Sequence, residues 1–146
     1  MNAASQNGTP IQIKFVTEIK DGLQKEHVAF DANGLYYIKG NSTYLSFEEK
    51  QETGTVKTII KISNEEVLIL RSGNVKMRQV YRKKEVTRGT FENALGTFEV
   101  LTKTNNIEYK WFKNSNKGSL FLSYELSLQG EKSGLYTISI MFKERI

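Results

Sequence analysis

The chain has 146 residues, 38% of them hydrophobic and 25% charged, which is ordinary for one globular domain and too apolar for a disordered chain. Its 21 basic and 16 acidic residues leave a net charge of +5, which permits an anionic partner without requiring one. No cysteine is present, so disulfides, cysteine zinc sites and thiol nucleophiles are excluded, as expected for a cytoplasmic protein.

Residues 1–10 are small and polar and have neither a basic start nor an apolar stretch. They therefore predict a flexible leader rather than a signal peptide. No apolar run approaches the roughly 18 residues that a membrane helix needs. The sequence thus predicts a leader over residues 1–10 and one soluble domain over residues 11–146, with no membrane partner.

From residue 11 onward, apolar and polar side chains alternate, which is typical of a strand with one buried face. Asp21-Gly22 and Asn33-Gly34 are the residue pairs that favour tight hairpin turns, and Gly40-Asn41 and Gly54 interrupt later strands. In the first half, strands are expected over residues 11–20, 23–30, 35–39, 43–49 and 56–62.

In the second half, strands are expected over residues 67–71, 75–82, 98–104, 107–111, 119–129 and 136–142. Residues 83–96 are expected to be irregular, with Asn105-Asn106 and Ser133-Gly134 as turns. About ten strands result, and no segment has the spacing of an amphipathic helix. The pattern predicts an all-β fold, a single antiparallel β-barrel of about eight to ten strands, because closure removes exposed sheet edges. A β-sandwich is the alternative.

Three segments carry a family resemblance: Tyr44-Leu45-Ser46-Phe47-Glu48-Glu49, Arg71-Ser72-Gly73, and Leu95-Gly96-Thr97-Phe98 leading to Thr102-Lys103-Thr104. Together they resemble the YwiB-like family of uncharacterised bacterial proteins, over nearly the whole chain beyond the leader. The resemblance implies a calycin-like, that is lipocalin-like, β-barrel in the bacterial cytoplasm. It implies no enzymatic activity and supplies no ligand, partner or catalytic residue.

Catalytic chemistry finds little support in the residues. His27 is the only histidine, and its neighbours Lys25 and Ala29 complete neither a catalytic triad nor a metal site. Phosphate-binding loops and nucleophile-elbow motifs are also absent from the sequence. We therefore expect no enzyme, no catalytic residues, no metal and no cofactor.

The best polar pair is Glu49 with Arg71, because alternation turns both toward the barrel interior. A buried charge must be paired, so Arg71 would need Glu49, Glu48 or an anionic ligand. The pair predicts an anchor for a carboxylate or phosphate at the barrel mouth. The favoured interpretation, however, is an internal salt bridge that fixes the strand register, or an arginine turned to water at a strand end. Glu48 faces the other side and cannot join Glu49 as a catalytic pair.

Inward-facing aromatic side chains are the other candidate ligand contacts, above all Tyr109 and Tyr124. They belong to a stripe that comprises Phe15, Tyr109, Trp111, Tyr124, Tyr136 and Phe142. Such a stripe lines a cavity in some small barrels. Bulky residues at nearly every inward position favour instead a largely packed interior.

Basic residues cluster on one outward strand face and the loop after it: Lys76, Arg78, Arg82, Lys83 and Lys84. Such a stripe suits a phosphate backbone, although a solvated face is the favoured interpretation. The sequence thus predicts first a non-enzymatic barrel that binds a small amphipathic or anionic ligand at its mouth. RNA or ribosome binding through the basic stripe, or a structural barrel that binds a protein, are the alternatives.

Overall fold

The computed structural model describes residues 8–52 and 54–145. These residues form ten strands and no helix: β1 (Thr9–Asp21), β2 (Gln24–Lys39), β3 (Ser42–Gln51), β4 (Gly54–Ser63), β5 (Glu66–Gly73), β6 (Lys76–Arg82), β7 (Val86–Asn93), β8 (Gly96–Phe112), β9 (Lys117–Leu128) and β10 (Glu131–Glu144). The predicted all-β class is confirmed. Thr9 and Pro10 of the predicted leader belong to β1, whereas residues 1–7 lie outside the described residues.

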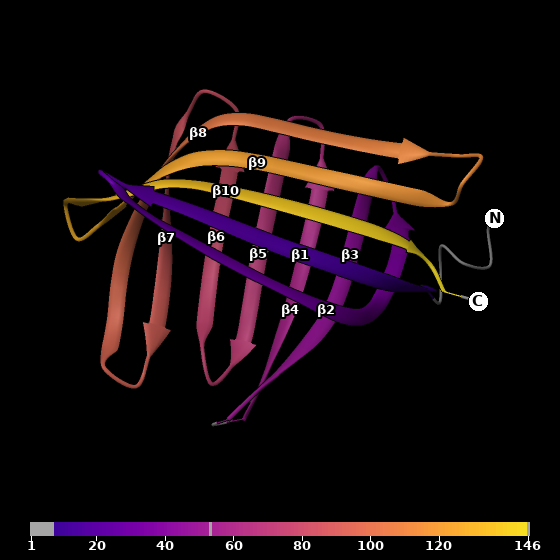
Figure 1. The fold of residues 1–146 in the computed structure, drawn as a ribbon, viewed down its shortest axis with the longest axis horizontal. Coiled ribbons are helices and arrows are strands. Elements are labelled where there is room, and N and C mark those ends of the chain that lie inside the picture. The colour runs from indigo at the N-terminus through magenta and orange to yellow at the C-terminus, as the bar shows by residue number, and fades with distance from the viewer. Residues whose placement is uncertain (1–7, 53, 146) are drawn as a thin grey trace.

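The strands form one closed antiparallel barrel. Each strand pairs with the next along the chain, and β1 also pairs with β10, so the ring closes between the first and the last strand. Figure 1 shows β8, β9, β10, β1 and β2 passing across β3 to β7, which stand behind them. The predicted barrel is therefore confirmed, with a strand number at the upper end of the expected range.

The core follows from the alternation of side chains along each strand. On β1 and β10, Ile13 pairs with Phe142 and Phe15 pairs with Ile140, all four facing inward. Met141, between Ile140 and Phe142, faces outward and is 58% exposed. Most of the interior is filled by such branched and aromatic side chains, as the sequence predicted.

Two predicted turns in the first half have different outcomes. The turn at Asn33-Gly34 is wrong, because β2 runs through both residues and pairs with β3 there. A Cβ atom at Gly34 would lie 2.3 Å from the carbonyl oxygen of Ser46, so the glycine serves close strand approach rather than a turn. The turn between β2 and β3 lies at Gly40-Asn41, as expected.

Three predictions in the second half are also corrected. The segment expected to be irregular, residues 83–96, contains β7. At Asn105-Asn106 the chain does not turn but forms a bulge between Thr104 and Asn106 within β8. The last hairpin turns at Gln129-Gly130, and Ser133-Gly134 instead marks a bulge in β10. Bulges use the same small and polar residues as turns, so the pattern did not separate the two.

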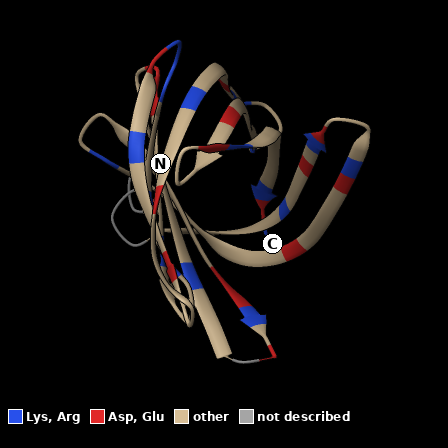
Figure 2. Cartoon of the chain, turned by 90° about the vertical axis from the view of Figure 1, so that its left-hand side faces the viewer, with Lys and Arg blue, Asp and Glu red and all other residues tan. Residues whose placement is uncertain are grey.

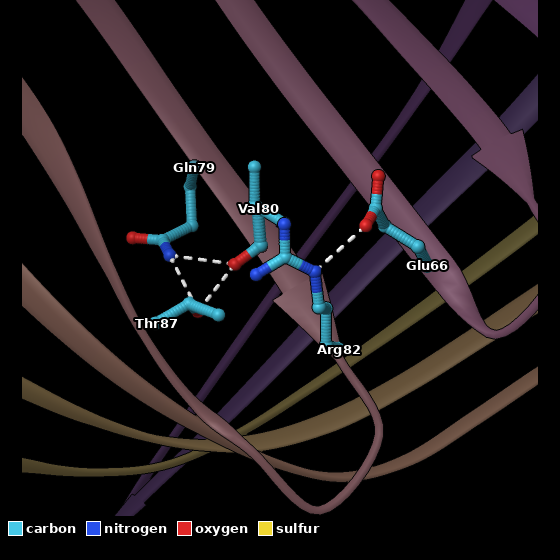
Figure 3. Close-up of polar contacts among 5 residues, drawn as sticks. All are labelled: Glu66, Gln79, Val80, Arg82 and Thr87. Atoms are coloured by element: carbon cyan, nitrogen blue, oxygen red, sulfur yellow. Dashed lines mark hydrogen bonds and ion pairs between the residues drawn. The ribbon is translucent and has the colours of Figure 1, made fainter.

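Pairing between β6 and β7 stops at Gln79 and Gly89, so the end of β6 has no ladder to β7. Figure 3 shows what replaces the ladder: the Val80 carbonyl accepts hydrogen bonds from Gln79 Nε2, at 2.8 Å, and from Thr87 Oγ1. Gln79 Nε2 also donates to Thr87 Oγ1, at 3.2 Å. We call this place the β6–β7 seam. At the seam, hydrogen bonds from the side chains of Gln79 and Thr87 connect the two strands where their backbones separate.

Candidate functional site

A cavity of about 260 Å³ lies inside one end of the barrel, where β3 and β5 end. We call it the Arg71 pocket. One wall consists of phenylalanines from β1, β2 and β3. Phe15 stacks on Phe30, with ring centroids 5.1 Å apart, and Phe47 lies 6.0 Å and 6.1 Å from the two rings. The rings of Phe47 and its neighbours form an apolar surface that suits an aromatic ring or a short hydrocarbon chain.

The other wall consists of tyrosines from β6, β9 and β10. Tyr124 lies 4.8 Å from Tyr81 and 5.4 Å from Tyr136, measured between ring centroids. Burial raises the pKa of Tyr81 to about 12, against smaller opposing effects of the Tyr124 hydroxyl and the Arg71 charge. Burial also raises the pKa of Tyr124 well above its ordinary value. The phenols are therefore neutral at physiological pH and offer hydroxyl groups within an apolar wall.

Arg71 and Glu49 lie at the mouth of the pocket, on the two strands that flank β4. Arg71 Nη2 donates to Glu49 Oε1 at 3.4 Å, and both side chains are 26% exposed. The contact joins one nitrogen to one oxygen, whereas a guanidinium carries five N–H donors and a carboxylate two acceptor oxygens. The ion pair thus keeps hydrogen-bonding capacity for a bound molecule.

Of the four predicted ligand-binding residues, three line the Arg71 pocket: Glu49, Arg71 and Tyr124. Tyr109 does not. It pairs with Leu120 of β9, whereas Tyr124 lies four residues further along that strand, or about 13 Å away. Both tyrosines face inward, but at different depths of the barrel.

Tyr109 belongs to an aromatic cluster away from the pocket. In that cluster Tyr36 stacks on Trp111 with centroids 5.1 Å apart and on Phe142 at 5.7 Å. Burial raises the pKa of Tyr109 and, less strongly, of Tyr36. Half of the predicted aromatic stripe therefore serves packing and the other half lines the pocket: Phe15, Tyr124 and Tyr136.

Sequence reasoning missed several pocket residues, among them the large side chains of Phe30, Phe47, Met77 and Tyr81. The hairpin of β5 and β6 pairs Met77 with Arg71, and Tyr81 follows on the same face. Counting back from the turn between these strands would have found both. Phe30 pairs with Phe15 through the hairpin of β1 and β2, so counting back from that turn would have found it as well.

Three larger hollows, of about 370 Å³, 690 Å³ and 380 Å³, take most of their lining from outward-facing side chains. The first lies around Lys14 and Met141, the second around Lys103 and Leu135, and the third between Lys76 and Glu92. None of them joins an ion pair to a wall of buried aromatic rings. The Arg71 pocket is therefore the stronger candidate, since specific sites combine an apolar lining with a few convergent polar groups.

The five predicted nucleic-acid contacts lie on β6 and the turn after it, and all except the half-buried Lys83 are exposed. Arg82 Nε donates to Glu66 Oε1 at 2.7 Å (Figure 3). Lys76 pairs in register with Glu92. Figure 2 shows basic and acidic segments interspersed on the side of the barrel that it presents. Acidic neighbours thus weaken the positive field of the basic stripe.

Two other kinds of site have no support in the part of the chain that the structure describes. His27 is exposed, opposite Glu18 of β1. Within residues 8–52 and 54–145, no three acidic or histidine side chains gather in a way that suits a metal ion. The same residues include no helix of the length and apolarity that crossing a membrane requires.

Fold and pocket together define a closed ten-stranded antiparallel β-barrel with a small aromatic cavity at one end. Residues 13–140 match the family model described as a domain of unknown function, DUF1934. The chain belongs to this YwiB-like family of β-barrel proteins.

Two comparisons place the chain within the family. It is 33% identical to the uncharacterized beta-barrel protein YwiB of Bacillus subtilis (strain 168) over 135 residues, which are 92% of this chain and 94% of that protein. The crystal structure of the ywiB protein from Bacillus subtilis superimposes with a TM-score of 0.83 at 31% identity, covering 94% of this chain and 93% of the other. Family and fold are therefore established together.

Proposed function

We propose that the protein binds a small amphipathic molecule in the Arg71 pocket, with the guanidinium of Arg71 holding an acidic group at the mouth. The observation that carries the proposal is the position of the Arg71–Glu49 pair, directly over a cavity walled by aromatic rings. Apolar walls supply affinity, and a few polar groups fix orientation. Arginine is well suited to this role because its planar fork matches a carboxylate.

The size of the cavity limits the ligand. At about 260 Å³ it lies just below the ~300 Å³ at which ordinary ligand pockets begin. A ring of one or two fused cycles, or a short branched chain, matches this space, whereas a long acyl chain does not. We therefore propose a small metabolite rather than a membrane lipid as the ligand.

Methionine methyl NMR tests the proposal. The chain has three methionines, of which Met77 lines the pocket and Met141 lies exposed on the outer wall. During titration with 2-naphthoate, the Met77 methyl signal should shift to saturation while Met141 stays in place. R71Q should weaken binding about tenfold or more, because a hydrogen-bonded charge contact contributes ~1.5–3 kcal/mol.

R82Q is the matched control, since Arg82 also forms an ion pair with a glutamate but on the outer wall. It should leave binding of 2-naphthoate unchanged. If R71Q binds the naphthoate as well as the unaltered protein does, or if neither the naphthoate nor a small aromatic amino acid moves the Met77 signal, the proposal is wrong.

Binding of RNA by the basic stripe has less support, because Glu66 and Glu92 lie beside two of its five residues. It stays a prediction of the sequence, as do a protein partner, the cytoplasmic location and the absence of catalysis. The lipocalin-like manner of binding is part of the proposal made here.

A further inference from the structure

The mouth of the Arg71 pocket presents two opposite charges side by side. Arg71 Nη2 and Glu49 Oε1 are 3.4 Å apart, and each side chain is 26% exposed at the cavity rim. In the described part of the chain, Arg71 donates one hydrogen bond and Glu49 accepts one, both in this same contact. Several donors of the guanidinium and one carboxylate oxygen are therefore available to a ligand.

A ligand with an acidic group alone meets a conflict at this rim. As its carboxylate approaches Arg71 it also approaches Glu49, and like charges at such distances repel each other. Displacing Glu49 would leave that carboxylate without its partner, which also costs free energy. A ligand that carries an ammonium beside its carboxylate avoids both penalties, because each of its charges faces an opposite one.

The cavity under the ion pair constrains the rest of the ligand. Its walls are the rings of Phe15, Phe30 and Phe47 on one side and those of the three tyrosines on the other. A pair of packed aromatic rings contributes ~0.5–1.5 kcal/mol of free energy in addition to the burial of apolar area. This corresponds to a factor of about 2 to 12 in affinity. The volume of about 260 Å³ leaves room for one such side chain.

We propose that the ligand is a zwitterion of the α-amino acid type with an aromatic side chain. Its carboxylate lies against Arg71, its ammonium against Glu49, and its ring between the two aromatic walls. This inference rests on the proposed function, since it names the class of molecule that the same pocket binds. It assigns Glu49 a role of its own, that of selecting against simple acids.

Three ligands of nearly equal size test the inference on the unaltered protein. L-Phenylalanine carries both charges, 3-phenylpropionate lacks the ammonium, and L-phenylalaninamide lacks the carboxylate. Followed by the Met77 methyl signal, L-phenylalanine should bind at least about tenfold more tightly than either analogue, because each analogue leaves one charge of the ion pair unmatched.

Variants then assign the preference to its source. E49Q should abolish the advantage of L-phenylalanine over 3-phenylpropionate, whereas E66Q, which alters the exposed partner of Arg82, should preserve it. Circular dichroism confirms that each variant is folded. If 3-phenylpropionate binds the unaltered protein as tightly as L-phenylalanine, the inference of a zwitterionic ligand is wrong, whereas the proposed binding of an acidic ligand is still supported. If neither of them, nor 2-naphthoate, moves the Met77 signal, the proposed function itself fails.

Discussion

Tyr81 and Tyr124 place phenol groups inside the barrel. Their hydroxyls are polar groups in the wall of the Arg71 pocket. They stay neutral because burial raises the pKa of both tyrosines. A tyrosine with a raised pKa resists ionisation in the folded state and ionises at its ordinary pKa in the unfolded chain. The free energy of unfolding is therefore linked to alkaline pH through these two residues.

The pH dependence has a definite sign. Below pH 10 both states hold the Tyr81 proton, so its contribution to stability is fully present; it is lost as the pH rises from 10 toward about 12. Tyr81 alone should remove about 2–3 kcal/mol over this range. Urea unfolding at pH 8, 10 and 11.5 measures the loss. Y81F should flatten the decline, and an equally steep decline in that variant would contradict the assignment.

Individual site residues were predictable only in part. Alternation along a strand tells which face a side chain takes, so Glu49, Arg71 and Tyr124 were correctly turned inward. It does not tell the depth in the barrel, because depth depends on how neighbouring strands are staggered. Tyr109 therefore shares the inward face of Tyr124 without sharing its pocket.

Among the elements, β6 and β7 have the weakest connection, since their ladder stops at Gln79 and Gly89. Beyond that point, Gln79 and Thr87 satisfy the Val80 carbonyl with side-chain hydrogen bonds. The buried Thr87 hydroxyl also accepts from Gln79. Buried polar groups need such partners, so the side chains of Gln79 and Thr87 stabilise the seam where the ladder ends.

Replacement of Thr87 by valine tests the β6–β7 seam. T87V keeps the shape of the side chain but removes its hydroxyl, which leaves buried groups of Gln79 and Val80 with fewer partners. We expect the free energy of unfolding to fall by about 1–3 kcal/mol, measured by urea unfolding. T90V, at an exposed position of the same strand, should change it by less than about 0.5 kcal/mol. Equal effects of the two variants would argue against the seam.

The order of strands was easier to predict than their ends. The hairpin turn expected at Gly40-Asn41 occurs there, and the one expected at Asp21-Gly22 lies one residue later, at Gly22-Leu23. Asn33-Gly34 and Asn105-Asn106 have the same chemistry, yet they lie within strands. Glycine and asparagine also permit close approach and bulges, which only the partner strand reveals. β7 was not predicted, because its alternating pattern is short and polar and only its pairing with β6 and β8 reveals it as a strand.

For the whole molecule, the decisive feature is the division between an apolar inside and a polar outside. Ile140 and Met141 are neighbours on β10, yet Ile140 is fully buried and Met141 is 58% exposed. The barrel could be predicted because this alternation recurs along most strands and closure covers every apolar face. The cavity could not be predicted, because its shape depends on the way in which the large side chains of six or more strands meet.

The two neighbours also provide a test of that division. I140A should lower the free energy of unfolding by about 2–5 kcal/mol, since it removes buried methyl groups and leaves a cavity. M141A should change it by no more than about 0.5 kcal/mol, because its side chain lies largely in water. Chemical denaturation measures both. Similar losses in the two variants would mean that β10 does not divide inside from outside as described.

Closure between β1 and β10 also affects how the protein is made. Ile11 pairs with Glu144, so the first strand finds its final neighbour almost at the other end of the sequence. During synthesis β10 leaves the ribosome after the other nine strands, and until then the nascent sheet has two unpaired edge strands that can pair with other chains. Each newly made molecule therefore passes through an interval of exposure that ends only when β10 has been made and has paired with β1.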